Sequence, residues 1–191
     1  ICAGSCAPMG VGPPAMNGRN QLSRVRRFIE ERDLGSRDVV VVACANGAGN
    51  LGGRPEIDGA PVYTAECAGS VHTSVIEFLV RSGVGGVLIV SCPPRDCWHR
   101  EGPKWLEQRL YHDREAELKV RVDKRRVRLA YAGLGERHLV QTALQEYRAD
   151  LMAMELAERE RDIVVDLSCE VPSQAAEAPQ PPQPSQEVRA S

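Results

Sequence analysis

Residues 86–101 read GVLIVSCPPRDCWHRE, and this stretch decides the fold. Its first part is a run of apolar, mostly β-branched residues, which is typical of a strand that is buried on both faces. Its second part is a Cys-x4-Cys loop in which Pro93 and Pro94 restrict the backbone between Cys92 and Cys97. The stretch therefore predicts a buried strand whose carboxyl end presents two thiols.

Two other predicted strands end in the same way. The strand over 38–43 runs into Cys44, and the strand over 62–66 runs into Cys67. In a parallel sheet the carboxyl ends of neighbouring strands meet at one edge, about 4.8 Å apart, and open α/β folds build their sites there. One cysteine at a strand end could be there only because a small side chain packs well. Three such cysteines at three strand ends are harder to explain in this way. We therefore expect a metal centre at this edge.

Strands alternate with amphipathic segments along most of the chain. This alternation predicts an α/β fold with a mostly parallel sheet and flanking helices, of flavodoxin-like or Rossmann-like form. The expected elements are helices over 19–33, 70–82, 104–124 and 136–161, strands over 38–43, 62–66, 87–91 and 127–131, and a short edge strand over 163–167.

Changes in composition divide the chain into four segments. We expect a remnant of a ferredoxin-type motif with a linker at 1–18, a linking helix at 19–37, the α/β domain at 38–168, and a disordered tail at 169–191 that is rich in Pro and Gln. Cys169 lies outside the domain pattern and is interpreted as a bystander.

Charge and cysteine content narrow the function. The 191 residues include 24 basic and 26 acidic side chains, so nothing points to nucleic acid or to an anionic membrane. No apolar run is long enough for direct membrane insertion. Seven cysteines without an export signal favour metal or redox chemistry over a disulfide framework. We expect a cytoplasmic protein, membrane-associated only through a partner or through a part that precedes Ile1.

The first residues carry a partial cluster motif. Cys2-x3-Cys6 followed by Pro8 is similar to the second half of the ferredoxin pattern C-x2-C-x2-C-x3-C-P, although the proline comes one position late. The first two cysteines of a [4Fe–4S] site would precede Ile1, so the chain is interpreted as part of a longer polypeptide. The alternative is a leader with two free thiols.

A glycine motif after the first strand suggests a dinucleotide site. Residues 47–52 satisfy G-x-G-x-x-G, and Glu66 lies where a ribose-binding carboxylate would be expected. The motif needs a helix that opens at its third glycine to bind the pyrophosphate. Gly and Pro fill the interval before the next strand, so we favour a closely approached loop over a nucleotide site.

Three motifs resemble the iron–sulfur (delta) subunit of methyl-viologen-reducing hydrogenases. The segments 44–47, 67–69 and 92–97 are similar to that family's strand-terminal C-x-x-C, C-S-G-like and C-x-P-x-D-C motifs. The resemblance covers roughly 38–150 and implies a [2Fe–2S] cluster. The four thiolates that it needs would come from Cys44, Cys67, Cys92 and Cys97. Gly47 stands where the family has a fifth cysteine.

The resemblance also implies a function and partners. Such a domain would be an electron-transfer component of an oxidoreductase complex, of hydrogenase or heterodisulfide-reductase type. It would relay electrons between a redox enzyme or ferredoxin-like module and a partner oxidoreductase, including cytochrome b-type proteins. The leading Cys2 and Cys6 are similar to the end of the ferredoxin module found in fused versions.

Other interpretations of the cysteines stay open. Zinc is a competing metal, although structural zinc usually uses tighter C-x2-C pairs. The domain could instead be a cofactor-free docking or scaffold module, or a thiol–disulfide redox protein that uses Cys92 and Cys97. Asp96, Trp98 and His99 flank the last ligand and are expected beside the centre; Asp96 is interpreted first as a turn-forming residue.

Overall fold

The structure is a computed structural model that describes residues 2–48, 55–112 and 117–169, and of 162–169 the backbone only. The chain divides into two units, 1–154 and 155–191. The sheet and both core clusters described below lie within the first unit. The predicted disordered tail falls outside the described residues from position 170, as do positions 49–52 of the glycine motif.

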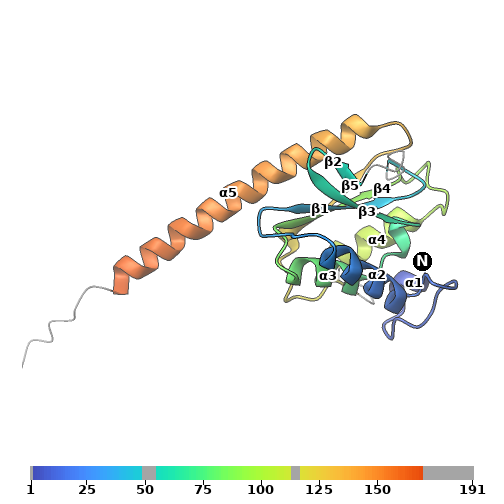
Figure 1. Cartoon of the computed structure of the whole chain (residues 1–191), viewed down its shortest axis with the longest axis horizontal. Coiled ribbons are helices and arrows are strands. Elements are labelled where there is room, and N and C mark those ends of the chain that lie inside the picture. Colours follow the sequence, from blue (N-terminus) through green and yellow to red (C-terminus); the bar gives the residue numbers. More distant parts are fainter. Residues whose placement is uncertain (1, 49–54, 113–116, 170–191) are drawn as a thin grey trace, which may run out of the picture. The chain divides into compact units, whose positions relative to one another are not determined.

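The described residues form one five-stranded sheet in the order β2-β3-β1-β4-β5 (Figure 1). The strands are β1 (Val39–Cys44), β2 (Glu56–Ile57), β3 (Ala60–Ala65), β4 (Gly86–Ser91) and β5 (Val127–Tyr131). All neighbours are parallel except β2, which pairs antiparallel with β3. Counted along the chain, the parallel strands follow the order 2-1-3-4 of flavodoxin-like folds. The predicted α/β fold class is thus confirmed.

The five described helices are α1 (Cys2–Ser5), α2 (Gly18–Glu30), α3 (Thr73–Arg81), α4 (Gly102–Tyr111) and α5 (Arg137–Cys169), with 3₁₀ turns η1 (Ala68–Ser70) and η2 (Lys124–Arg126). Of these helices, α3 and α4 connect parallel strands, α1 and α2 precede β1, and α5 follows β5. Within the described parts, no helix is both long and apolar enough to cross a membrane.

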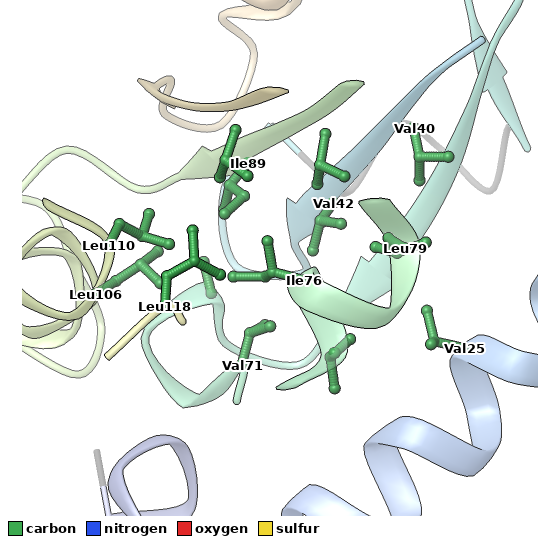
Figure 2. Packing of buried hydrophobic residues seen from close by; sticks show 14 of the residues in the cluster. Val25, Val40, Val42, Val71, Ile76, Leu79, Ile89, Leu106, Leu110 and Leu118 are labelled. Carbon is green, nitrogen blue, oxygen red and sulfur yellow. The ribbon is translucent and has the colours of Figure 1, made fainter. Parts of the chain in front are cut away.

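Alternate residues of each strand face opposite sides of the sheet and build two cores. On one side, Val40 and Val42 of β1 pack with Ile89 of β4 and with α2, α3 and α4 (Figure 2). On the other side, Val39 and Val41 pack with apolar residues of α5. This burial on both faces explains why β1 and β4 are continuous apolar runs.

Several predicted elements differ in extent. The predicted helix over 104–124 ends at Tyr111, and the apolar Leu118 reaches the core from an irregular segment instead of from this helix. The predicted edge strand over 163–167 is wrong, since α5 continues through it. The predicted helix over 70–82 begins only at Thr73, after η1.

A short hairpin was not predicted. β2 and β3 are joined at Asp58 and Gly59, whose φ angles of 48° and 74° are both positive. Two consecutive left-handed residues form the type I′ turn that joins tight hairpins, and Asp-Gly is among its preferred sequences. That dipeptide was the available signal. The consequence is that β2 covers the start of the β3 edge.

At the opposite edge, a tyrosine takes the place of a further strand. The hydroxyl of Tyr111 donates to the carbonyl of Val127 at 3.3 Å and accepts from the N–H of Leu129 at 3.1 Å. Both groups belong to β5, on the side away from β4. α4 therefore ends with a side chain that satisfies two backbone groups of the edge strand.

Candidate metal centre

The candidate centre begins where β1 and β4 end. Cys44 is the last residue of β1 and Cys92 follows the last residue of β4. These neighbouring strands form the switch point of the sheet, because the chain continues from β1 to β3 in one direction and from β4 to β5 in the other. Open α/β folds bind their ligands at such a point. The Cys92 thiol donates to the Cys44 sulfur at 3.4 Å, and both side chains are buried.

The third and fourth thiols come from the neighbouring loops. Cys67 follows β3, is buried, and precedes the η1 turn. Its side chain is hydrogen-bonded to that of Cys44. Cys97 lies in the β4–α4 loop, is partly exposed, and interacts electrostatically with both Cys67 and Cys92. The structure thus brings the three predicted strand-end thiols together with the loop thiol of Cys97.

Two glycines let these loops approach each other. A Cβ added to Gly69 would lie 2.5 Å from the Cα of Gly102, so η1 and the start of α4 touch through their backbones. A Cβ added to Gly102 would lie 3.5 Å from the sulfur of Cys97 and 3.6 Å from that of Cys67. Gly102 therefore leaves a space beside two of the four sulfur atoms that a side chain would fill.

The thiols share protons unequally. Hydrogen bonding from the Cys67 side chain lowers the pKa of Cys44 to about 5, and the backbone N–H groups of Ala68 and Asn46 act in the same direction. Hydrogen bonding to Cys44 raises the pKa of Cys67 well above its usual value. Burial raises the pKa of Cys92 to about 12. Deprotonation of the set is therefore favoured at Cys44 and disfavoured at Cys67 and Cys92.

The donor set consists of thiols, which are the ligands of iron–sulfur clusters and of other soft metals. Among the described residues, no three Cys, His, Asp or Glu side chains are placed to hold one metal ion. Two thiolates on one tetrahedral metal, with bonds of about 2.3 Å, lie roughly 3.8 Å apart. The 3.4 Å between the sulfurs of Cys44 and Cys92 is close to that spacing. A [2Fe–2S] cluster needs four thiolates over two irons, and the four clustered cysteines supply that number.

The N-terminal cysteines, Cys2 and Cys6, make contacts that differ from those of the four clustered thiols. Cys2 is exposed, and Cys6 is partly exposed. Backbone N–H groups of the following turn, with that of Val11 foremost, lower the pKa of the Cys6 thiol. The Cys6 carbonyl lies 3.1 Å from Nε2 of His72, and α1 packs against η1. This segment is therefore held beside the loop that carries Cys67.

The residues predicted to flank the last ligand are exposed. Trp98 is 81% exposed, and the side chains of Asp96 and His99 also face solvent. The backbone N–H of Asp96 donates to the Pro93 carbonyl at 3.0 Å, so Asp96 lies in a turn. Cys169 is the last residue of α5.

Sequence analysis missed three residues near the sulfurs. Gly69 and Gly102 matter through close approach, which a one-dimensional pattern does not reveal. Arg109 is 2% exposed in α4, between the core residues Leu106 and Leu110. Its signal was its position three residues after Leu106, on the apolar face of the helix.

Comparison with known proteins assigns the chain to a family. A family model described as methyl-viologen-reducing hydrogenase, delta subunit, matches residues 39–155. No curated protein matches the chain. The matched region runs from the start of β1 into α5, covers more than half of the chain, and includes all four clustered thiols. The chain belongs to the family of methyl-viologen-reducing hydrogenase delta subunits.

Proposed function

We propose that this chain is an electron-transfer subunit or domain that holds one [2Fe–2S] cluster through Cys44, Cys67, Cys92 and Cys97. The observation that carries the proposal is the meeting of these four thiols at the switch point of a flavodoxin-like sheet. When bound, such a cluster supplies a carrier for one electron at a time.

The chain's own groups would bind and tune the centre. The four thiols lose their protons on ligation, so metal binding releases protons and weakens as the pH falls. Backbone N–H groups of Ala68, Asn46 and Gly69 already donate toward sulfur. Donors of this kind stabilise negative charge on thiolates and so influence the potential.

Burial gives the centre one accessible side. Cys44, Cys67 and Cys92 are buried, whereas Cys97 is partly exposed, and the adjacent Trp98 is 81% exposed. Electrons would be exchanged most readily through the β4–α4 loop, because this is where a partner can approach a ligand. The proposed partners are other redox subunits or domains: a hydrogenase, a heterodisulfide-reductase-like protein, a ferredoxin-like module or a cytochrome b-type protein.

The N-terminal segment suggests one of these partners. Cys6 is held beside the Cys67 loop through His72, and α1 packs on η1. A [4Fe–4S] module completed by cysteines before Ile1 would therefore adjoin the proposed [2Fe–2S] centre. Electrons would pass between the two through this contact.

The test is the iron and acid-labile sulfide content of the full chain, purified anaerobically, together with its visible spectrum. We expect about two irons and two sulfides for the proposed centre. Cys92→Ala should lose both. Gly102→Ala is the sharper variant, since its Cβ would lie beside the sulfurs of Cys97 and Cys67 while making only ordinary contacts. Compared with the parent, it should keep the melting temperature of the iron-free chain and lose cluster occupancy.

Gly10→Ala is the matched control, because an added Cβ there meets nothing within 4 Å. It should bind iron as the parent does. A parent chain that stays free of iron after anaerobic reconstitution would overturn the proposal and favour a cofactor-free scaffold. Reversible thiol oxidation without iron would instead favour a thiol–disulfide protein. Two candidate disulfides should then be examined. One joins Cys92 to Cys97, and the other joins Cys92 to Cys44, whose sulfurs are 3.4 Å apart.

A further inference from the structure

Arg109 is a buried cation without an acidic partner. Its side chain is 2% exposed, and its Nε has no hydrogen-bond partner. The other nitrogens donate to uncharged oxygens: the Gly69 carbonyl at 3.0 Å, the Val71 carbonyl at 3.4 Å and the Ser5 hydroxyl at 3.3 Å. Among the described residues no carboxylate pairs with it. Burying a charge is costly unless an opposite charge compensates for it.

A candidate for that opposite charge is the thiol centre. Burial lowers the pKa of Arg109 to about 10, while Coulombic attraction to Cys67 acts in the opposite direction. The guanidinium is therefore charged at neutral pH. It holds the carbonyl of Gly69, and Gly69 touches Gly102, which borders the sulfurs of Cys67 and Cys97. Arg109 thus lies directly behind the loop that presents Cys67.

The N-terminal segment closes the other side of the guanidinium. A Cβ on Gly4 would lie 2.7 Å from Nη2 of Arg109 and 3.1 Å from the Gly69 carbonyl. Ser5, which is partly exposed, reaches Nη1 with its hydroxyl. Water is therefore kept from most of the guanidinium, and charge interactions are stronger where water is excluded.

We propose that Arg109 is the counter-ion of the four-thiolate centre and raises its reduction potential. This inference rests on the function proposed above. Four thiolates give a two-iron cluster a net negative charge, and one-electron reduction adds a further negative charge. A fixed positive charge nearby stabilises the reduced form more than the oxidised form. Arg109 is a positioning residue as well, because it fixes the Gly69 carbonyl and hence the Cys67 loop.

The test is a redox titration of the full, cluster-loaded chain with dithionite as the reductant, followed by electron paramagnetic resonance. Arg109→Gln keeps a donor for the Gly69 carbonyl but removes the charge. We expect its equilibrium constant for one-electron reduction to fall at least tenfold. For one electron, a tenfold change corresponds to a decrease of about 59 mV in the midpoint potential. Arg109→Lys, which keeps the charge, should stay closer to the parent than Arg109→Gln does.

A second pair of variants leaves Arg109 in place. Ser5→Asp puts a carboxylate beside the guanidinium nitrogen that the serine hydroxyl now contacts. The carboxylate should compensate the positive charge of Arg109 locally and lower the potential. Ser5→Asn should not, because Asn has nearly the shape of Asp but carries no charge. This pair decides the question even where Arg109→Gln fails to fold.

The outcomes separate this inference from the proposed function. A parent chain without iron overturns both. A loaded parent whose potential is unchanged in Ser5→Asp and in every folded Arg109→Gln preparation overturns only the counter-ion role. Equal shifts in Ser5→Asp and Ser5→Asn would also contradict it, because charge would not be the cause.

Discussion

At the scale of single residues, glycines set the distances between the thiol-bearing loops. Gly47 shows this most clearly, because it stands where a fifth cysteine is usual in the family resemblance. A Cβ there would lie 3.0 Å from the Ala132 carbonyl and 3.2 Å from the Cys92 sulfur. Any side chain at this position must therefore displace either a backbone oxygen or a proposed ligand.

Gly47→Ala should accordingly destabilise the chain by about 1–3 kcal/mol, the usual cost of overpacking. Urea unfolding with and without bound iron would measure it, and the loaded chain should also release iron faster. Gly35→Ala is the control, since its Cβ would meet only the Asp38 carboxylate, at an ordinary 3.8 Å. Equal stability of the two variants would contradict the account.

At the scale of elements, the basic run 124–126 has a structural role at the start of a strand. It forms η2, immediately before β5. The Asp123 carboxylate accepts from the backbone N–H of Arg125 at 2.9 Å and from its guanidinium, while Arg126 donates to the Gly85 carbonyl at 3.0 Å. The run therefore fixes the entry into β5 and ties it to the start of β4.

This arrangement predicts a pH dependence. The hydrogen bond from the Arg125 side chain lowers the pKa of Asp123 below its usual value. A carboxyl group with a lowered folded-state pKa stabilises the fold above its unfolded pKa of about 3.9, and this contribution is lost as the pH falls through the folded-state value. Asp123→Asn should cost about 0.2–1 kcal/mol at pH 6, the range for exposed ion pairs, and less at pH 3.

Urea midpoints of the two proteins at both pH values would measure the difference. In an Arg125→Gln background the effect of Asp123→Asn should shrink, because the pair is already broken. A difference that grows toward pH 3 would have the wrong sign for this explanation.

Sequence patterns predicted the elements that bury long apolar runs. The bounds of β1, β4 and β5 were predicted within a residue or two. The edge where Cys44, Cys67 and Cys92 meet was also predicted, because the carboxyl ends of parallel strands lie at the same edge of a sheet. The pattern failed where apolar residues reach the core from irregular backbone, as at Leu118. It also could not reveal contacts between distant segments, such as Gly69 with Gly102 or Arg109 with Ser5.

At the scale of the whole molecule, the two cores share the same strands. Val40 and Val42 belong to one cluster, and Val39 and Val41 to the other. Loss of packing on either face therefore weakens the support of the opposite face. We expect the first unit to unfold in a single cooperative transition, as small domains usually do.

Leu144→Ala tests this on the α5 side. Leu144 is fully buried, so its truncation should cost about 2–5 kcal/mol. Leu139, on the same helix but 40% exposed, is the matched control and should change stability by about 0.5 kcal/mol or less. Circular dichroism and tryptophan fluorescence should report the same lowered midpoint for Leu144→Ala. Separate transitions would show that the two faces unfold independently.

The hydroxyl of Tyr111 has a consequence for association between chains. It already satisfies the Val127 carbonyl and the Leu129 N–H, two backbone groups on the outer edge of β5. At the other edge, the two residues of β2 cover the start of β3. Exposed strand edges are the usual templates for intermolecular strand addition and for amyloid-like growth. Strand addition is therefore blocked at the start of β3 and at Val127 and Leu129 of β5, so a partner that extends the sheet would first have to displace Tyr111 or β2 at these positions.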